Sequence, residues 1–330
     1  MSILVTGASG FVGTHLVKRL VADGHQVYAL VRSTSKVEEL KQVTTELVYG
    51  DVRDKASLEQ IFQQHQEINT IFHLASLLTP VTVRDRVYWE VNYQGTQNVL
   101  DACRVLPLKA FVHCSSVGVI GPLPEIPANE QSRCAPDSNY GESKYQAELL
   151  ALEYHHSFHL PVTVVRPAWV YGPGDRRTYK FFRMVAKGKF FIVGDGQTKL
   201  HPVYVDDVVQ GLILCAEQID KAVGEVFIVA GATSVTLEYL ASVIAQEAGS
   251  SLLPFKVPAS IAKIGVTVCE AICKPLDIEP PIHRRRLDFF LRDQAFDISK
   301  IRNTLGFEPQ IDVPTGVKRA VNWYREQGWL

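Results

Sequence analysis

The sequence predicts an α/β fold, a doubly wound parallel sheet accompanied by a smaller, mixed α/β lobe. In the first half of the chain, short apolar runs alternate with longer amphipathic segments. Such alternation implies right-handed crossovers between parallel strands, with helices on both faces of the sheet. The chain has 330 residues, 46% of them hydrophobic and 21% charged, which is enough for a large core and two lobes. We expect the sheet domain to span 1–170, with some later segments returning to it, and the second lobe to occupy most of 171–330.

The first predicted element is a strand at Ser2–Val5, followed by a glycine-rich turn and a helix near 12–23. The turn places Gly7, Gly10 and Gly13 at a G-x-x-G-x-x-G spacing. Glycine suits a backbone that bends sharply or lets an anion approach closely. A helix N-terminus adds unpaired N–H groups and the positive end of the helix dipole. The segment therefore indicates a pyrophosphate cradle, with a turn that is merely rich in glycine as the alternative.

The elements that follow repeat the same alternation. Further strands are predicted at Gln26–Val31, Glu46–Tyr49, Thr70–Leu74, Ala110–Cys114 and Val162–Arg166, and further helices near 55–65, 84–104 and 140–157. In a doubly wound sheet, ligands bind outside the carboxyl ends of the strands. The residues just beyond the predicted strand ends are Gly7, Arg32, Asp51, Ala75, Ser116 and Pro167. We expect them to line one site at that edge.

The helix near 140–157 carries a tyrosine and a lysine four residues apart, Tyr140 and Lys144, and Ser116 precedes them. Residues at i and i+4 share one face of a helix. The ammonium can stabilise the tyrosinate, and such a phenol can pass a proton to or from a substrate oxygen that a serine hydroxyl orients. Many amphipathic helices carry this spacing by chance, so the assignment depends on the cradle and the strand ends around it.

Beyond about residue 170 the pattern becomes less regular, and glycine turns and prolines punctuate it. We expect a smaller lobe that closes over the sheet and supplies substrate contacts. The apolar stretch Ile261–Cys273 is too short to span a bilayer. A partly buried helix is favoured there over a helix that lies against a membrane or an apolar substrate.

Charge and cysteine usage exclude several classes of protein. The net charge of −1 gives no reason to expect a nucleic-acid partner. The six cysteines show no zinc-type spacing, so we expect reduced thiols and no metal site. A strand that starts at residue 3 leaves no room for a secretory signal, which favours a cytoplasmic protein.

Taken together, the motifs resemble those of the extended short-chain dehydrogenases/reductases, the NAD(P)-dependent epimerase/dehydratase superfamily, whose sheet is of the Rossmann type. The resemblance covers essentially the full chain. The segments that carry it are Thr6–Gly13, Gly50–Val52, His73–Ala75, Val91–Asn92, Gly95–Thr96, Ser115–Ser116, Tyr140–Lys144, Arg166–Pro167, Val170–Pro173 and Tyr204–Asp207. Because they occur in order and at sensible distances, the set is specific.

The resemblance implies a nicotinamide cofactor and a catalytic set of Ser116, Tyr140 and Lys144. Ser116 is preferred to Ser115 because it stands five residues before Gly121, in a segment that resembles the family's S-x-x-x-[YI]-G. The adenine would meet Asp51 and Val52, and the nicotinamide would stack near Pro167. With the cradle included, the expected cofactor contacts are Gly7, Gly10, Phe11, Val12, Gly13, Arg32, Lys36, Asp51, Val52, Leu74, Ala75, Ser76, Tyr140, Lys144 and Pro167.

The end of the second strand bears on the choice of cofactor. An acidic residue there would hydrogen-bond the adenosine 2′-hydroxyl of NAD and repel a phosphate. This chain instead has Arg32 and Ser33, with Lys36 close behind. Because a guanidinium binds a phosphate bidentately, we predict NADP(H). NAD(H) is the alternative, in which Arg32 only stacks on adenine or faces solvent.

Two reaction classes remain open. One is a dehydrogenase or reductase that exchanges a hydride with one substrate carbon, and the other is a nucleotide-sugar epimerase or dehydratase that keeps its cofactor. Nucleotide-sugar members often read R-D-F-[TV]-Y-V-D-D, but here Leu200 occupies the arginine position. The segment looks more like the 3β-hydroxysteroid dehydrogenase and dihydroflavonol reductase branches. We therefore favour a carbonyl reductase for a small, fairly apolar molecule.

Three further hypotheses carry less support. Arg286, in the run His283–Arg286, could reach an anionic substrate group, although a solvated basic face is the simpler interpretation. A non-catalytic nucleotide sensor would be expected to have lost Ser116, Tyr140 or Lys144, and all three are present. A homodimer is implied only by the resemblance.

Overall fold

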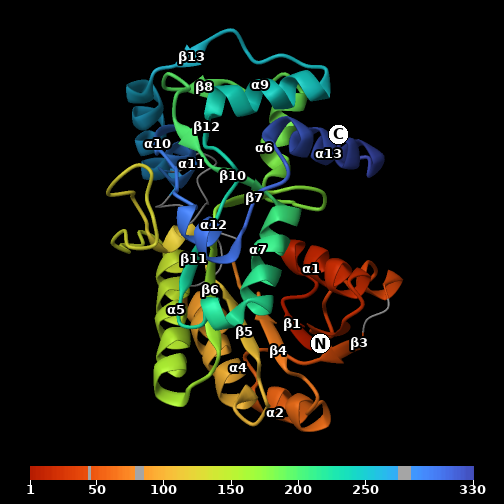
Figure 1. Cartoon of the computed structure of the whole chain (residues 1–330). Coiled ribbons are helices and arrows are strands. Elements are labelled where there is room, and N and C mark those ends of the chain that lie inside the picture. Colours follow the sequence, from red (N-terminus) through yellow and green to blue (C-terminus); the bar gives the residue numbers. More distant parts are fainter. Residues whose placement is uncertain (44–45, 79–84, 274–283) are drawn as a thin grey trace.

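Parallel strands form the central sheet of the computed structural model, which describes residues 1–43, 46–78, 85–273 and 284–330. Within these residues the strand order is β11-β6-β5-β4-β1-β2-β3 (Figure 1). The strands are β1 (Ser2–Thr6), β2 (Gln26–Val31), β3 (Glu46–Tyr49), β4 (Thr70–His73), β5 (Ala110–Cys114), β6 (Val162–Pro167) and β11 (Val226–Val229). The predicted bounds of the first six strands agree with these to within one residue, and the predicted Rossmann-type doubly wound sheet is confirmed.

Helices cover both faces of the sheet because successive side chains of a strand point to opposite faces. Ile3 and Val5 of β1 pack in one apolar core with α1 (Phe11–Ala22) and α7 (Val205–Glu217). Leu4 packs in the other core, which the remaining helices of the sheet domain close. These helices are α2 (Lys55–Gln64), α4 (Gly95–Cys103) and α5 (Asn139–Phe158). Burial on both faces explains why the strands are continuous apolar runs.

The sheet is completed by chain that follows residue 170. Strand β11 pairs in parallel with β6, with Val226 opposite Val164, and α7 packs against α1. We did not predict the seventh strand, because its four residues fall in the part of the sequence where the alternation of strand and helix is irregular.

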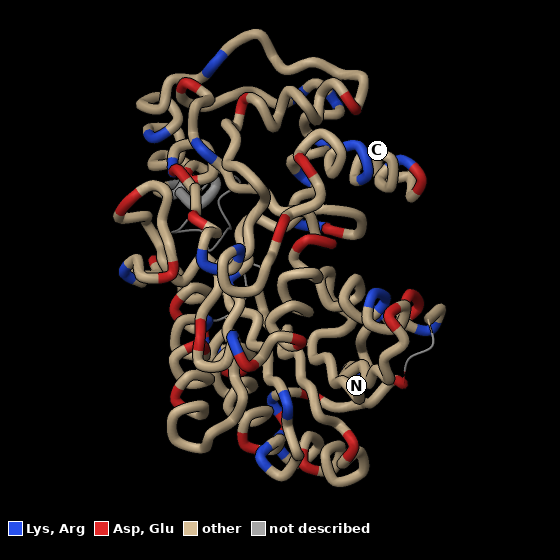
Figure 2. Tube along the Cα trace, viewed as in Figure 1, with Lys and Arg blue, Asp and Glu red and all other residues tan. Residues whose placement is uncertain are grey.

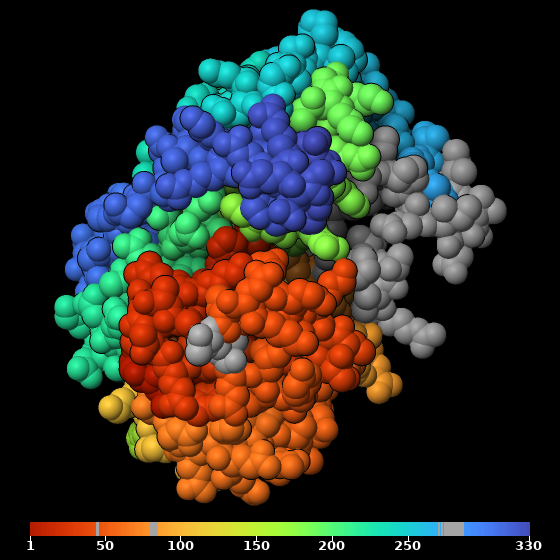
Figure 3. All heavy atoms as spheres, turned by 90° about the vertical axis from the view of Figure 1, so that its right-hand side faces the viewer, coloured from red at the N-terminus to blue at the C-terminus, as the bar shows by residue number. Residues whose placement is uncertain are grey.

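Short strands and further helices make up the rest of the described chain. The strands are β7 (Trp169–Tyr171), β8 (Ile192–Val193), β9 (Lys199–Leu200), β10 (Pro202–Tyr204), β12 (Val235–Thr236) and β13 (Lys256–Val257). The helices are α3 (Asp85–Tyr88), the π-helix η2 (Trp89–Gln94), α6 (Tyr179–Ala186), α8 (Ile219–Ala222), α9 (Leu237–Ala248), α10 (Ala259–Cys273), α11 (Arg284–Leu291), α12 (Ser299–Leu305) and α13 (Val313–Glu326), with 3₁₀ turns η1 (Leu40–Gln42) and η3 (Val117–Val119). In Figure 1, α6, α9 and α13 lie on the far side of β7 and β10 from the central sheet. In the side view of Figure 3, this second lobe (green to blue) lies over the red N-terminal segment.

The strand order reverses between β1 and β4, since β2 and β3 continue to one side and β5, β6 and β11 to the other. A doubly wound sheet binds its ligand at this switch point, beyond the carboxyl ends of the strands. Gly7 follows β1 there, and Leu74 and Ala75 follow β4. The topology therefore places the predicted cradle at the switch point.

Helix α10 contains the apolar stretch predicted as a partly buried helix. Val266 is only 2% exposed, but Ile261, Ile264 and Val268 are 59%, 65% and 52% exposed. These three residues lie on one face of the helix, at i, i+3 and i+7. One face of α10 is thus packed and another is apolar and open. Among the residues that the structure describes, no helix has the length and apolar character needed to cross a membrane.

Candidate functional site

The turn after β1 requires glycine at two positions. Gly7 has φ +68°, and a Cβ there would lie 2.7 Å from backbone atoms of Leu74 and Ala75. A Cβ on Gly13 would lie 2.2 Å from the carbonyl oxygen of Gly7. Any side chain at these positions would push the turn away from β4 or from the first turn of α1. The two glycines therefore hold the turn tightly closed against the end of β4.

The N-terminus of α1 is left open to an anion. Gly10 is the N-cap residue, and among the described residues no side chain caps this helix end or places a carboxylate in its first turn. The first N–H groups of a helix have no partner within the helix, and the dipole there favours negative charge. The predicted contacts Gly10, Phe11, Val12 and Gly13 thus fit a diphosphate group such as that of a dinucleotide cofactor.

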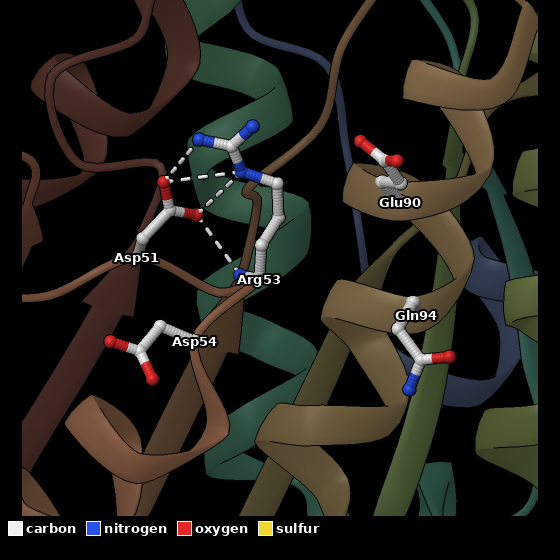
Figure 4. Close-up of a pocket in the computed structure, with 5 residues that line it drawn as sticks. All are labelled: Asp51, Arg53, Asp54, Glu90 and Gln94. Atoms are coloured by element: carbon white, nitrogen blue, oxygen red, sulfur yellow. Dashed lines mark hydrogen bonds and ion pairs between the residues drawn. The ribbon is translucent and has the colours of Figure 1, made fainter.

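A paired carboxylate lies at the predicted adenosine end of the site. Arg53 donates to Asp51 through Nη2 (2.7 Å to Oδ2), Nε (3.1 Å to Oδ1) and its backbone N–H (2.9 Å to Oδ1). The Arg53 guanidinium holds the pKa of Asp51 below its ordinary value, and Arg32 contributes to the same effect. A pocket of about 360 Å³ opens beside this pair, lined by Asp51, Arg53, Asp54, Glu90 and Gln94. Figure 4 shows Glu90 and Gln94 on the helical segment that faces Asp51 and Arg53.

The two cations predicted to select the cofactor follow β2. Arg32 and Lys36 are both exposed. The Arg32 backbone N–H donates to the Ser35 hydroxyl (3.0 Å), and the Ser35 N–H donates to the Arg32 carbonyl (2.9 Å). These bonds fix a tight turn while the Arg32 side chain stays in solvent near Asp51.

The hydroxyls of Ser116 and Tyr140 meet beyond the end of β5. Ser116 accepts a hydrogen bond from the Gly118 N–H (3.0 Å) and caps η3. Tyr140 stands in the first turn of α5, and Ser138 caps that helix by accepting from the Gly141 N–H (3.0 Å). Burial raises the pKa of Tyr140 to about 12, although hydrogen bonds from the Ser116 and Ser76 side chains act to lower it. The phenol is therefore protonated at neutral pH.

Lys144 lies one turn further along α5 and is 1% exposed. Its Nζ donates to the Cys114 carbonyl oxygen (2.6 Å), and burial lowers its pKa to about 8. We predicted that the ammonium would bias Tyr140 toward tyrosinate. The structure differs, because the ammonium is directed at the end of β5 and burial dominates the pKa of the phenol.

The neighbouring serine is committed to a buried ion pair. Ser115 donates to Glu148 Oε2 (2.7 Å), and Arg166 donates to the same oxygen through Nε (3.1 Å) and to Oε1 through Nη2. The side chains of Arg166 and Glu148 are 5% and 1% exposed. Because the Ser115 hydroxyl is occupied inside the protein, Ser116 is the serine that can face a ligand.

A buried asparagine connects the end of β4 to α5. Asn92, on the π-helix η2, accepts from the Leu77 N–H (2.7 Å) and from the Ser76 hydroxyl (3.2 Å), and donates to the Ser143 hydroxyl (2.9 Å). The segment after β4 and the helix that carries Tyr140 are thus held in one network. π-Helical turns often occur at functional sites.

Of the remaining predicted residues, Val52, Ala75 and Pro167 lie near the carboxyl ends of the strands, and Leu200 lies elsewhere. Val52 is 7% exposed and lies against Gly95, and Pro167 ends β6. The Ala75 N–H donates to the Thr6 hydroxyl (3.1 Å), which ties β4 to β1. Leu200 is wholly buried in the apolar core that also contains α1 and α7. His283 and the side chain of Arg286 lie outside the described residues.

Sequence reasoning missed three charged side chains near the site. Arg53 follows Asp51 by two residues, a spacing at which a carboxylate often caps local backbone N–H groups. Glu148 falls one turn beyond Lys144 on the buried face of α5, where a charge demands a partner. Arg177 lies close enough to lower the pKa of Tyr140, although it follows Tyr140 by 37 residues and belongs to the second lobe. No local pattern signals that last contact.

Comparison with known proteins decides the family. The family described as the NAD dependent epimerase/dehydratase family matches residues 3–230, more than half of the chain. The chain belongs to this family. The predicted resemblance is confirmed, and so is the prediction of an NAD(P)-dependent enzyme.

Relatives within the epimerase/dehydratase family are similar over nearly their full length. Sterol-4-alpha-carboxylate 3-dehydrogenase, decarboxylating, from Schizosaccharomyces pombe is 28% identical and covers 98% of this chain and 97% of its own. The crystal structure of gox2253 has a TM-score of 0.85 at 28% identity over 99% of each chain. The structure of UDP-glucose 4-epimerase with UDP-glucose from Thermotoga maritima has a TM-score of 0.80 at 26% identity over 99% of each chain.

Proposed function

We propose that this protein is an NADP(H)-dependent oxidoreductase that interconverts a carbonyl and a secondary alcohol on a small, fairly apolar substrate. The observation that carries the proposal is the group of hydroxyls at the switch point. Tyr140 stands between Ser116 and Ser76, at the same sheet edge as the open N-terminus of α1. A protonated phenol beside a second hydroxyl is suited to bind a carbonyl oxygen and give it a proton.

The chain's own residues perform the proton transfer and the positioning. Ser116 and Tyr140 donate hydrogen bonds to the substrate carbonyl oxygen. When bound, a reduced nicotinamide would supply the hydride to the carbonyl carbon. As the C=O π bond breaks, Tyr140 transfers its proton to the oxygen, which leaves an alcohol and a tyrosinate. Lys144 lies one helical turn along α5, and its ammonium, which donates to the Cys114 carbonyl oxygen, stabilises that tyrosinate through its charge. A proton from solvent then restores the phenol.

The charges at the end of β2 support NADP(H) over NAD(H). Asp51, at the predicted adenosine end of the site, would repel a 2′-phosphate, but Arg53 donates to both of its carboxylate oxygens. Arg32 and Lys36 are exposed and free to turn toward a phosphate. Two cations and one neutralised carboxylate favour the phosphorylated cofactor.

The nucleotide-sugar epimerase reaction is the second candidate. It is favoured by similarity to a UDP-glucose 4-epimerase solved with its substrate. Leu200 weighs against it, because a wholly buried leucine replaces the arginine expected to bind a substrate phosphate.

An assay at the absorbance of the reduced nicotinamide tests both alternatives. Ketones, steroidal and flavonoid-like carbonyls and nucleotide sugars are each offered with NADPH or with NADH. A reductase consumes one equivalent of cofactor per product, with a higher kcat/KM for NADPH. Product from a nucleotide sugar without net cofactor consumption would instead support the epimerase, and a strong preference for NADH would overturn the cofactor assignment.

A further inference from the structure

The loop between β7 and α6 lies directly on the N-terminus of α1. The His15 Nε2 atom, on the second turn of α1, is 2.9 Å from the Pro173 carbonyl oxygen. Gly174 has φ +90°, and a Cβ there would lie 3.9 Å from the Phe11 ring. The loop thus contacts α1 one turn beyond the N–H groups that are open to an anion, and Gly174 lies beside Phe11 in the first turn.

Arg177 extends from this loop toward the site. Its Cζ atom is 6.0 Å from the centroid of the Phe11 ring, and its charge acts to lower the pKa of Tyr140. Phe11 is the first residue of α1, and Tyr140 is the proposed proton donor. The guanidinium is therefore near the first residue of α1 and close enough to the phenol to act on its charge.

A buried carboxylate holds Arg177 in this place. Asp175, which is 1% exposed, accepts from the Arg177 N–H (2.9 Å) and Nε (3.1 Å), and from the Thr178 hydroxyl (2.9 Å). Tyr324 donates to the Asp175 carbonyl (2.8 Å), so the second lobe anchors the loop as well. The terminal nitrogens of Arg177 have no hydrogen-bond partner among the described residues. The Arg177 side chain is thus held through its Nε atom, and its terminal N–H groups are available to a ligand.

We propose that Arg177 binds the diphosphate of the nicotinamide cofactor from the side of the second lobe, opposite the N-terminus of α1. The inference rests on the proposed function, since it requires that cofactor in the cradle. A diphosphate carries two negative charges, and a helix N-terminus supplies the equivalent of only about half a positive charge. A guanidinium adds a full charge and paired N–H donors of the geometry that phosphate oxygens accept.

The neighbouring arginine provides a matched control. The Arg176 guanidinium lies over the Trp329 ring, with its Cζ atom 5.3 Å from the ring centroid. Arg176 and Arg177 therefore belong to one loop and carry one charge each, but only Arg177 approaches Phe11 and Tyr140. Substitution of either residue changes the net charge equally.

The test measures binding of nucleotides to the full chain by isothermal titration. The variants are Arg177→Gln, Arg177→Lys and Arg176→Gln, and the probes are NADPH, ADP-ribose and adenosine 2′-monophosphate. We expect Arg177→Gln to weaken NADPH and ADP-ribose by about ten- to a hundredfold, the size of a charge-assisted hydrogen bond. Adenosine 2′-monophosphate, which lacks a diphosphate, binds unchanged. Arg177→Lys retains part of the affinity and Arg176→Gln retains all of it.

The outcomes separate this inference from the proposed function. If the unmodified protein binds none of the nucleotides, the proposed function fails first. If it binds NADPH and Arg177→Gln binds NADPH and ADP-ribose equally well, the diphosphate contact is wrong. A rise in KM confined to anionic substrates, with nucleotide binding unchanged, would make Arg177 a substrate contact and also overturn it. Equal melting temperatures, with Arg177→Lys as the second variant, exclude a loss of folding caused by the uncompensated Asp175.

Discussion

Ser115 and Ser116 are adjacent residues with the same side chain, yet they enter two opposite environments. Ser115 is 5% exposed and donates to Glu148 inside the protein. Ser116 is half-buried and lies beside Tyr140 at the edge of the sheet. The two environments begin at the same strand end because consecutive side chains of an extended chain point in opposite directions.

The inner network is charged and nearly closed, whereas the outer one is neutral and open. Glu148 accepts from Ser115 and twice from Arg166, and both charges are buried. Tyr140 and Ser116 carry hydroxyls whose donors and acceptors can be shared with a ligand. The closed network therefore fixes α5 in place, whereas the open network on the same helix leaves its hydroxyls available to a ligand.

The largest expected effect concerns the open network. Replacement Tyr140→Phe removes the proton donor and should lower kcat by about 10²–10⁴-fold, the usual contribution of a positioned acid. Steady-state turnover with NADPH measures the loss, and titration of the cofactor serves as the control because its affinity should change little. A variant that turns over at a near-normal rate would show that Tyr140 is not the acid.

The next effect concerns the closed network. Replacement Glu148→Gln leaves Arg166 buried without its counter-charge and should lower the free energy of unfolding by about 3–5 kcal/mol. Urea denaturation measures this change, and Glu153→Gln, an exposed glutamate on the same helix, is the matched control. A loss below that of the control would mean that the ion pair does not fix α5.

The adjacent serines test the comparison itself. Ser115→Ala removes one donor to Glu148 and should cost about 1–3 kcal/mol of stability, with kcat retained. Ser116→Ala removes the cap of the short turn η3 and should cost about 0.5–1 kcal/mol of stability. It should lower kcat by about 10²–10³-fold, as for the loss of one oxyanion donor. Stability and turnover are measured on both variants. If Ser115→Ala instead lowers kcat and Ser116→Ala instead has the larger loss of stability, Ser115 is the serine at the site and Ser116 is the buried one.

The smallest effect comes from pH, through Lys144, which lies between the two networks. Burial lowers the folded-state pKa of Lys144 to about 8, whereas an unfolded lysine titrates near about 10.4. Between these values the unfolded chain binds more protons, so stability should rise with pH. Turnover should fall through the same window, by roughly tenfold at pH 9, since the ammonium is lost. Denaturation and kcat are followed from pH 7 to 10.

Lys144→Met provides the control for this pH dependence. The variant has no ammonium to discharge, so the rise in stability between pH 8 and 10 should vanish. A rise that persists in Lys144→Met would assign the titration to another group.

The sheet and the outline of the site could be predicted from local patterns. Apolar runs predicted the strands, and the spacings of Gly7 and of Tyr140 and Lys144, taken with the strand ends around them, predicted the candidate site. The partners of buried charges could not be predicted. Glu148 and Arg166 meet across 18 residues, and Arg177 approaches Tyr140 from another lobe, so only the packed chain brings them together. The direction of the Lys144 ammonium also depends on a carbonyl that the sequence cannot place.

The distribution of charged residues along the chain agrees with the composition. Figure 2 shows Lys and Arg residues interspersed with Asp and Glu along the trace, in keeping with the net charge of −1.

The place of β11 has a consequence for synthesis of the chain on the ribosome. Strand β6 gains its outer neighbour only when Val226–Val229, which follows α7 in the chain, has been made. The nascent sheet thus keeps an unpaired edge at β6 until about residue 229 has left the exit tunnel. Such edges template association with other chains. A chaperone that binds nascent chains would find its target there, in the interval between translation of β6 and of β11.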